Sequence, residues 1–525
     1  MVPSLRQIFL LFFLLPFSVK GQNTIALPDI ANYSKQQYRA GLQNWDIVQS
    51  QNGVLYIANN EGVLRYDGVY WKLYSLPNKT IVRSVAIGPD NRLFLGGQDE
   101  IGYFLPGKDG NLEYVSLTKL IPEKYRSFGD VWDIAILGKD VFFRSANLIF
   151  RYSNQTVSVY NAVLEWSYMG VCNGKLYAHD FQNGIYLFEN EQWKPLIANN
   201  PAFQFDPVTA ILPYRGDTCL VSTLKNGLFK TAGDKLIPFS TPAIERISSY
   251  RIYNGARLNE TTLALATNQN GLQIINNDGQ LLQSFTRQEG LQNNNILCVF
   301  SDREGNIWLG LDNGIAMISY SNPIKRLTPK SDDGAGYSAI IHANRLYAGT
   351  SGGLYSTALE SVPDLGFSQG DFTEVANTTG QTWGLAEVNG HLLLGHHEGP
   401  FEIKNNVAKR ILPLQGFWNF IPVSAVSPSP LVVAGHYKGL QFFRYENGEF
   451  LPASLLSGFS ESSRFITLDN DDNIWVSHPY HGIFKITRNK DRYQVELYKD
   501  DKGLPSALNN HVYKLRNQVV IATEK

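Results

Sequence analysis

The stretch NILCVFSDREGNIWLGLDNGIAMISYSNPIKRLT, residues 295–328, decides the fold of this chain. Its apolar runs are short and lie between turns: 296–301, 306–311, 314–320 and 324–328. Gly314 follows the second run, where a glycine can adopt the positive φ that a tight hairpin needs. None of the runs has helical periodicity, so the stretch predicts four antiparallel strands.

The same pattern recurs along the whole chain. Clear copies are LYIANNEGVLRY (55–66), LYAGTSGGLYST (346–357) and IWVSHPYHGIFKI (474–486). The glycine or its equivalent returns about every 42 residues, which is the length of one four-stranded β-propeller blade. Blades stack around an axis and cover one another's faces. The sequence therefore predicts an all-β fold of tandem β-propellers with four-stranded blades.

Composition agrees with this fold and excludes other classes of protein. The chain is 12% aromatic and 18% charged and holds 45 Gly, a balance typical of β-sheets joined by tight turns. Its 43% hydrophobic content excludes intrinsic disorder. With 46 basic and 47 acidic residues, the chain lacks the basic excess that binding to nucleic acid requires.

The repeats predict two rings of different completeness. Residues 22–325 are expected to form a seven-bladed β-propeller, with Ile30–Tyr33 as an outer strand that completes the seventh blade. Residues 326–525 are expected to form a partial second propeller of about four and a half blades. Because the last repeat ends after two strands, we expect the sequence to be the N-terminal fragment of a longer protein.

Residues 1–21 are typical of a secretory signal peptide. Arg6 supplies the positive charge, residues 8–17 are apolar, and a cut before Gln22 follows small residues. Ten apolar residues are too few to span a bilayer as a helix, which argues against a membrane anchor. We therefore expect an exported, periplasmic chain.

The three cysteines occur in apolar, strand-like runs. They are Cys172, Cys219 and Cys298. An odd number of cysteines in such positions favours small buried hydrophobic residues, so we expect three unpaired core thiols.

Two stretches carry a family resemblance. NNNILCVFSDREGNIWLGLDNGIAMI and DDNIWVSHPYHGIFKI resemble the two-component regulator propeller repeat. The opening YRAGLQNWDIVQSQNGVLYIANNEGVLRYDGVYWKLYSLPN is similar to exported sensors of Bacteroidetes-type bacteria. In that family two seven-bladed propellers precede a triple-tyrosine β-sandwich, one transmembrane helix and an output module, either a LuxR-type helix-turn-helix or a histidine kinase.

This resemblance implies a periplasmic sensor region. Its partners would be a small-molecule or oligosaccharide ligand and no nucleic acid, and it would have no cofactor. The membrane would be reached only through the absent C-terminal part, which would anchor the full-length protein in the inner membrane. A homodimer of the full-length protein is compatible with this organisation.

Tryptophans near the beginning of inner strands are the first candidate site. They could present flat apolar faces and N–H donors at a channel mouth, with acidic residues beside them. The alternative is core packing, which we expect for Trp308 and Trp475 inside the repeat motif. The candidate ligand-binding residues are Trp45, Asp46, Trp132, Asp133, Trp166, Trp383 and Trp418.

Three histidines occupy one turn position in consecutive repeats, namely His396, His436 and His478. They could be solvated turn residues, a polar rim around a ligand, or metal ligands. Equivalent loops of neighbouring blades diverge, so we expect a polar rim or turn residues and no metal site. Residues 469–473 are rich in Asp, but they lack the glycine and distal Glu of a calcium loop and are expected to be a turn.

No nucleophile elbow, phosphate-binding loop or Cys-x-x-Cys pair occurs in the sequence, so we expect this region not to be an enzyme. Two functions remain. The first is a sensing module that binds a small molecule or glycan and relays its state to an output module. The second is a secreted propeller enzyme, a hydrolase or lyase, that acts on carbohydrate.

Overall fold

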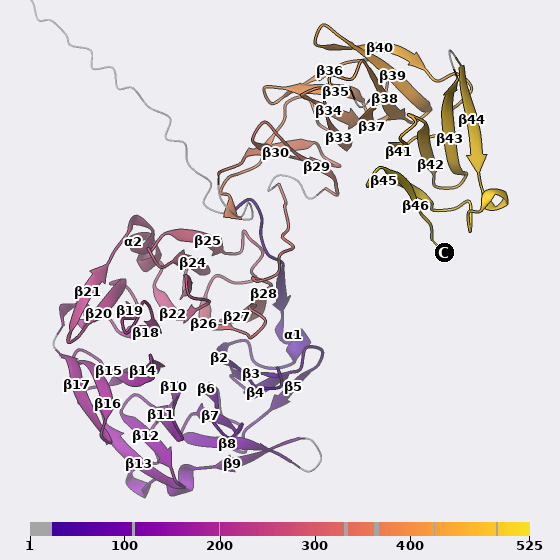
Figure 1. Ribbon diagram of the computed structural model, residues 1–525. Helices are drawn as coiled ribbons and strands as arrows, with labels where there is room; N and C mark the ends of the chain where they lie inside the picture. Colours follow the sequence, from indigo (N-terminus) through magenta and orange to yellow (C-terminus); the bar gives the residue numbers. More distant parts are fainter. Residues whose placement is uncertain are drawn as a thin grey trace, which may run out of the picture. The chain divides into compact units, whose positions relative to one another are not determined.

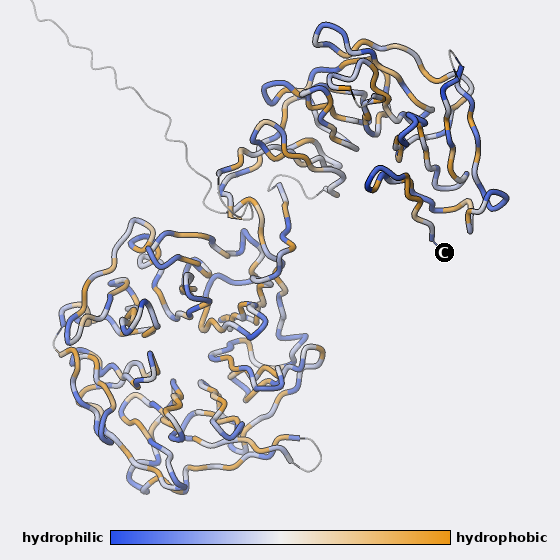
Figure 2. Tube along the Cα trace, viewed as in Figure 1, coloured by the Kyte–Doolittle hydropathy of each residue, from blue (hydrophilic) through white to orange (hydrophobic). Residues whose placement is uncertain are grey.

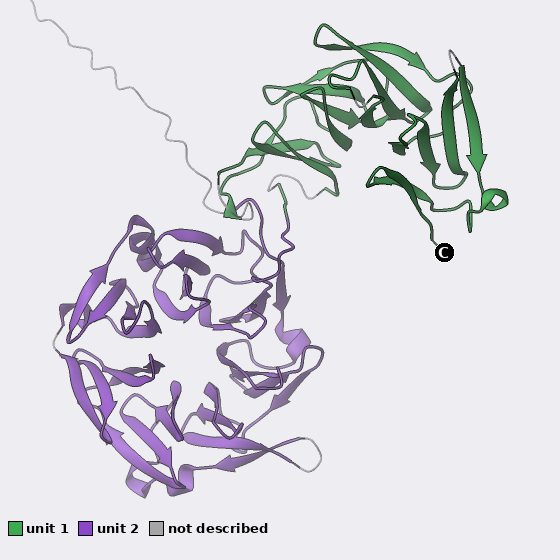
Figure 3. Cartoon of the chain, in the orientation of Figure 1, with its two compact units in different colours: residues 1–21, 327–525 green, residues 22–326 purple. Residues whose placement is uncertain are grey.

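The chain forms two compact units with a boundary between Arg326 and Leu327 (Figure 3). We call residues 24–326 the N-terminal unit and residues 327–524 the C-terminal unit. The predicted signal peptide lies outside the described residues. Among the described residues, no helix has the length and apolar character to cross a membrane. The computed structural model describes residues 24–107, 111–198, 200–329, 334–361, 367–424, 426–489 and 492–524.

The N-terminal unit is built from antiparallel sheets of four strands arranged as a ring, and the first strand of each sheet faces the centre (Figure 1). We number the sheets blades 1 to 7 in chain order. From the inner strand outward they are β2–β5 (Asn44–Gln49, Leu55–Asn59, Gly62–Tyr66, Trp71–Tyr74), β6–β9 (Val82–Ile87, Leu93–Gly97, Glu100–Pro106, Leu112–Ser116), β10–β13 (Asp133–Leu137, Asp140–Arg144, Leu148–Ser153, Thr156–Asn161), β14–β17 (Trp166–Cys172, Lys175–Asp180, Gly184–Glu189, Gln192–Ala198), β18–β21 (Val208–Pro213, Cys219–Thr223, Leu228–Ala232, Lys235–Phe239), β22–β25 (Ile252–Arg257, Thr262–Thr267, Leu272–Asn276, Leu281–Phe285) and β26–β28 with β1 (Ile296–Ser301, Ile307–Leu311, Gly314–Ile318, Ile30–Tyr33).

The start of the chain closes the ring. Strand β1 pairs with β28 from Ile30 opposite Ile318 to Tyr33 opposite Ile315, as predicted for an outer strand of blade 7. The fourth strand predicted at residues 324–328 does not form, because β1 already occupies the edge of β28. In blade 7, β26 also contacts β2 of blade 1, so that the first and last blades are neighbours.

The C-terminal unit continues the same architecture. It contains blades 8 to 11 and a final hairpin, β45–β46 (His511–Leu515, Gln518–Ala522). Blades 8 to 11 are β29–β32 (Gly336–His342, Arg345–Thr350, Leu354–Ala358, Thr373–Glu374), β33–β36 (Thr382–Val388, His391–His396, Gly399–Lys404, Val407–Arg410), β37–β40 (Phe417–Pro422, Leu431–His436, Gly439–Glu446, Glu449–Leu455) and β41–β44 (Phe465–Leu468, Ile474–His478, Gly482–Asn489, Arg492–Tyr498). Short helices lie in connections: α1 (Lys35–Tyr38), α2 (Pro242–Ser249), and the 3₁₀ turns Thr118–Leu120, Glu123–Tyr125, Pro201–Phe203 and Asp500–Lys502.

The hydrophobic core lies between neighbouring blades. Hydrophobic and hydrophilic segments are interspersed throughout both units (Figure 2). One cluster joins Ala58 of blade 1 to Val85 of blade 2. Another joins Ile47 of blade 1 to Trp308 of blade 7, which confirms the packing role predicted for Trp308. Each blade therefore depends on both neighbours for burial, and stability is spread around the ring.

Hydrogen bonds within one blade explain why Asp and Trp recur in the repeat motif. The carboxylate of Asp302 accepts hydrogen bonds from Asn306 N at 2.7 Å and from Trp308 Nε1 at 2.8 Å. In blade 11 Asp469 accepts from Trp475 Nε1 at 3.0 Å in the same way. The Asp thus fixes the turn and orients the Trp, and the Asp-rich segment at 469–473 is a turn, as predicted.

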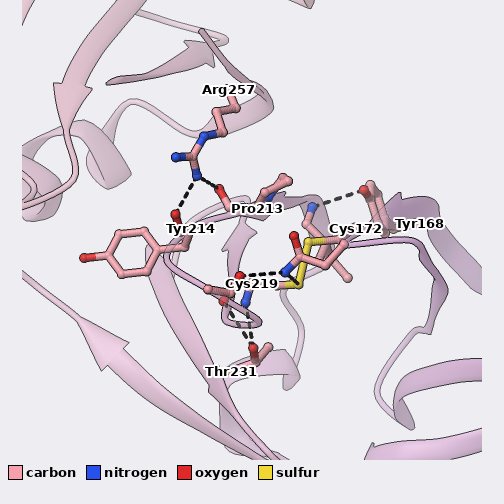
Figure 4. The surroundings of a disulfide bond; sticks show 10 residues. Tyr168, Cys172, Pro213, Tyr214, Cys219, Thr231 and Arg257 are labelled. Carbon is pink, nitrogen blue, oxygen red and sulfur yellow. Dashed lines mark hydrogen bonds between the residues drawn. A yellow bond between two sulfur atoms is a disulfide. The ribbon is translucent and has the colours of Figure 1, made fainter. Parts of the chain in front are cut away.

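The cysteine prediction is wrong for two of the three residues. Cys172, at the end of β14, and Cys219, at the start of β19, form a disulfide between blades 4 and 5 (Figure 4). Their separation of 47 residues is close to one repeat, which brings equivalent ends of adjacent blades together. Cys298 is a buried free thiol.

Candidate ligand site at the channel mouth

The inner strands carry a repeated irregularity near their first residues. In six blades of the N-terminal unit, one residue of the inner strand is skipped in the pairing with the second strand. Such a β-bulge bends the strand and re-aims one side chain. The skipped residues are Trp45, Arg83, Ser167, Thr209, Tyr253 and Leu297.

Blade 3 has a similar irregularity, which lies just before its inner strand. Trp132 N donates to Arg144 O at 2.8 Å, and the next residue, Asp133, pairs with Arg144 as well. Two residues of the inner chain therefore oppose one residue of β11, as in a bulge.

The re-aimed side chains share one cavity. It has a volume of about 370 Å³, and all six skipped residues line it together with Trp132. Asp133, Arg144 and Glu165 add charge to its wall. Because each blade contributes one side chain at the same level, the cavity is the mouth of the central channel.

Two of the predicted tryptophans meet at this mouth around a cation. The ring centroids of Trp45 and Trp132 are 5.9 Å apart, in an edge-on arrangement. The guanidinium carbon of Arg83 lies 4.0 Å from the Trp45 centroid and 4.5 Å from the Trp132 centroid. Arg83 Nε pairs with Asp130 at 2.9 Å, whereas its Nη1 is buried without a hydrogen-bond partner among the described residues. The cluster offers apolar ring surface beside a positive charge.

The predicted acidic residues tie neighbouring blades together. Asp46 accepts from Val85 N of blade 2 at 3.0 Å, and Asp133 accepts from Met169 N of blade 4 at 2.8 Å. Asp133 is also ion-paired with Arg144 and lines the cavity. These carboxylates serve the ring itself, because they satisfy N–H groups of adjacent inner strands.

Asp46 is electrostatically unusual. Burial raises the pKa of its carboxyl group to about 7, against the lowering effect of hydrogen bonds from Val85 N and Ile47 N, and the negative charge of Asp133 adds to the rise. A perturbed carboxyl group of this kind is a mark of functional sites as well as of structural ones.

Trp166 does not join the predicted site. It is only 2% exposed and packs with Phe142, Met169 and Ala178 between blades 3 and 4. In blade 4 the bulged residue is Ser167, one position later, so Trp166 points into the core. The prediction is therefore corrected to core packing for this residue.

Sequence reasoning missed Arg83, Tyr253 and Ser167. Each occupies the second position of its inner strand, the same position as Trp45, so an alignment of the repeats by strand register would have found them. Ser167 Oγ lies 2.6 Å from Nδ1 of His179, a residue with no exposed surface. Burial, and to a smaller extent the charge of Arg144, lowers the pKa of His179 to about 3.

The C-terminal unit has a similar aromatic cluster. Bulges in β29, β33 and β37 skip Tyr337, Trp383 and Trp418. The centroids of the two Trp rings are 4.8 Å apart, and the guanidinium carbon of Arg464 lies 5.2 Å from the Trp418 ring. Trp383 Nε1 donates to Tyr437 Oη at 2.9 Å. Bulges in the inner strands thus bring Trp383 and Trp418 together, as they do for the aromatic residues of the N-terminal unit.

The three predicted rim histidines are turn caps. In each, Nδ1 accepts a hydrogen bond from the backbone N–H two residues later, at 3.0 Å for His396 and His436 and at 3.2 Å for His478. His396 and His436 are 1% and 3% exposed, and burial lowers the pKa of all three imidazoles. The polar rim is corrected to a set of neutral capping residues.

His478 also belongs to a cluster that resembles a metal site. Its Nε2 lies 3.6 Å from Glu461 Oε2, and His481 Nδ1 lies 2.9 Å from the same oxygen. The donor atoms of the three residues lie within 4.8 Å of one another. The two imidazole rings are stacked with an interplanar angle of 12°, however, and a metal ion lies in the plane of each ring that binds it. This geometry fits an ion-paired cluster and does not fit shared coordination.

Comparison with known proteins agrees with the repeat analysis. A family model described as "Two component regulator propeller" matches residues 290–313. No curated protein is significantly similar to the sequence.

Among solved structures, the extracellular domain of a hybrid two-component system from B. thetaiotaomicron is 17% identical, with a TM-score of 0.67 over 95% of this chain and 70% of that chain. A second such domain from the same organism is 16% identical, with a TM-score of 0.45 over 94% of this chain and 70% of that chain. Virginiamycin B lyase from Staphylococcus aureus is 15% identical, with a TM-score of 0.43 over 55% of this chain and 97% of that chain. The chain therefore carries the two-component regulator propeller repeat, as its sequence predicts, and shares its fold with the extracellular domain of a hybrid two-component system.

Proposed function

We propose that the chain is the sensing region of an exported signalling protein and that the channel mouth of the N-terminal unit binds its ligand, a small molecule or glycan. The observation that supports this proposal most strongly is the cluster of Trp45, Arg83 and Trp132. Three successive blades aim these side chains into one cavity. Flat rings beside a cation suit the apolar face and the hydroxyl groups of a sugar.

The disulfide between Cys172 and Cys219 supports export, because disulfides persist in oxidising compartments. The repeat and the shared fold support a signalling role. In this proposal a bound ligand alters the ring, and an output module reads that change.

The experiment is a titration of the chain with a panel of neutral and acidic oligosaccharides, followed by tryptophan fluorescence and calorimetry. We expect Trp132→Ala and Arg83→Gln to weaken binding at least about tenfold, as loss of a stacked ring or charged donor does. Trp418→Ala is the matched control, since it removes an equivalent ring from the C-terminal unit. An equal loss of ligand affinity in Trp418→Ala, or the absence of binding by the unaltered chain, would contradict the proposal.

One observation favours the second candidate, an enzyme that cleaves carbohydrate. Burial raises the pKa of Asp46 to about 7, the charge of Asp133 adds to the rise, and glycosidases use a pair of carboxyl groups. Release of reducing sugar from any panel member, abolished by Asp46→Asn, would support this function. Binding without turnover would support the sensor.

A further inference from the structure

A second cavity lies in the C-terminal unit, at the turns that join the first to the second strand of blades 8 and 9 and at the turn that joins the third to the fourth strand of blade 9. Its volume is about 770 Å³. We call it the turn-side cavity and define it by its charged and ionisable wall: His342, Arg345, His391, Glu402 and Lys404. These turns lie at the opposite end of each blade from the bulged residues, so the cavity is separate from the aromatic cluster of this unit.

Most of this wall is fixed by a network around one acid. Glu402, only 7% exposed, is bonded to His391 Nδ1 at 2.5 Å and to Lys404 Nζ at 2.8 Å. His391 Nε2 in turn lies 2.8 Å from Tyr445 Oη of blade 10. The negative charge of Glu402 is therefore compensated within the network, and His391 and Lys404 are held in place.

Arg345 lies outside this network, and its hydrogen-bond partners are neutral. Its Nη2 donates to Ser356 Oγ at 2.9 Å, and Ser356 donates to Asn406 Oδ1 at 2.6 Å. Both partners are neutral, and none of the ion pairs found among the described residues includes Arg345. Its Nε is buried and has no hydrogen-bond partner among the described residues.

A partly buried guanidinium without an acidic partner is costly unless a counter-charge reaches it. The hydrogen bonds to Ser356 and from Ser356 to Asn406 add a second feature, because they hold in place the planar donor group of a residue that lines the cavity. Planar guanidinium groups bind carboxylate, sulfate and phosphate through paired hydrogen bonds. His342, which is bonded through Nδ1 to Glu387 Oε2 at 2.8 Å, supplies a further polar group on the same wall.

We propose that the turn-side cavity binds a small molecule that carries an oxyanion, with Arg345 as its principal ligand and Lys404 as a second cation. The shared chemistry is a carboxylate, sulfate or phosphate group on a small molecule. This site is independent of the channel mouth, and its failure would leave the proposed sensing function untouched.

The test uses the full chain and three probes, namely glucuronic acid, glucose 6-sulfate and glucose 6-phosphate, with glucose as the uncharged comparison. We expect at least one charged probe to bind by calorimetry and to raise the melting temperature, while glucose does neither. Arg345→Gln should weaken that binding at least about tenfold, and Arg345→Lys, which keeps the charge and loses the planar fork, should weaken it less. The three charged probes separate the carboxylate, sulfate and phosphate sources.

Arg444→Gln is the matched control, because Arg444 is an exposed arginine of the same unit whose partner is Glu446. It should leave probe binding unchanged. Without probe, Arg345→Gln should melt no lower than the unaltered chain, since it removes an uncompensated charge. The proposal is overturned if none of the charged probes binds, or if Arg345→Gln and Arg444→Gln bind the probe equally.

Discussion

The ring of Trp45 stands edge-on to the ring of Trp132 at a centroid distance of 5.9 Å, although the two residues belong to blades 1 and 3. The blade between them contributes Arg83, whose guanidinium lies against both rings. Residues far apart in the sequence thus converge because every inner strand begins at the same level of the channel.

This arrangement predicts that replacing tryptophans in similar sequence positions lowers the free energy of unfolding by different amounts. Trp132→Ala should lower the free energy of unfolding only slightly, because the ring is half-buried at the cavity. Trp166→Ala should cost about 3–5 kcal/mol, since it empties part of a packed core. Urea unfolding of the two variants measures both values. Similar costs for the two would contradict the distinction between mouth and core.

A second prediction concerns pH. The carboxyl group of Asp46 has a pKa raised from 3.8 to about 7 in the folded chain, so the folded state holds a proton there that the unfolded state releases. Its contribution to stability is therefore present in full below about pH 4 and is lost as the pH rises to about 7. Asp46→Asn removes this loss. The melting temperature of this variant should therefore rise relative to that of the unaltered chain as the pH increases from 5 to 8.

The control for this comparison is Asp278→Asn, which changes a largely exposed carboxylate. Its melting temperature should follow that of the unaltered chain across the same pH range. A constant difference between Asp46→Asn and the unaltered chain would show that Asp46 has an ordinary pKa.

A third prediction follows from the disulfide. The denatured, non-reduced protein should contain one reactive thiol, Cys298, and reduction should raise the number to three. Replacing Cys172 and Cys219 by Ser should cost about 2–4 kcal/mol of stability, because the cross-link restricts the unfolded chain. Thiol titration and urea unfolding measure the two effects. Three thiols without reduction would restore the original prediction of unpaired cysteines.

The capping histidines give a fourth prediction. His436 is only 3% exposed; it accepts from Lys438 N through Nδ1 and is bonded to Gln415 O through Nε2 at 2.9 Å, so His436→Ala removes two hydrogen bonds and a packed side chain. We expect a loss of about 1–3 kcal/mol in thermal or urea unfolding. His481→Ala, which removes an exposed ion pair with Glu461, should cost less than about 1 kcal/mol. Equal losses would mean that His436 is not a structural cap.

The sequence by itself determined the repeat and most of the strands. Alternating apolar runs, the turn glycines and the Asp302 to Trp308 motif act through bonds within one blade, so they are visible in a local pattern. The outer strand at Ile30–Tyr33 was also predicted, but the repeat placed another fourth strand at residues 324–328, and only the pairing of β1 with β28 decided between them.

Only the tertiary structure decided which residues meet. Trp45 is the residue skipped by the bulge in blade 1 and faces the channel, whereas the bulge in blade 4 skips Ser167 and leaves Trp166 in the core. Which of two adjacent residues faces the channel depends on the register of the strand pairing. Cys172 and Cys219 pair because ring stacking aligns strand ends one repeat apart, a relation between blades and not within one. Contacts that cross from blade to blade depend on the curvature of the ring, and that curvature is a property of the assembled fold.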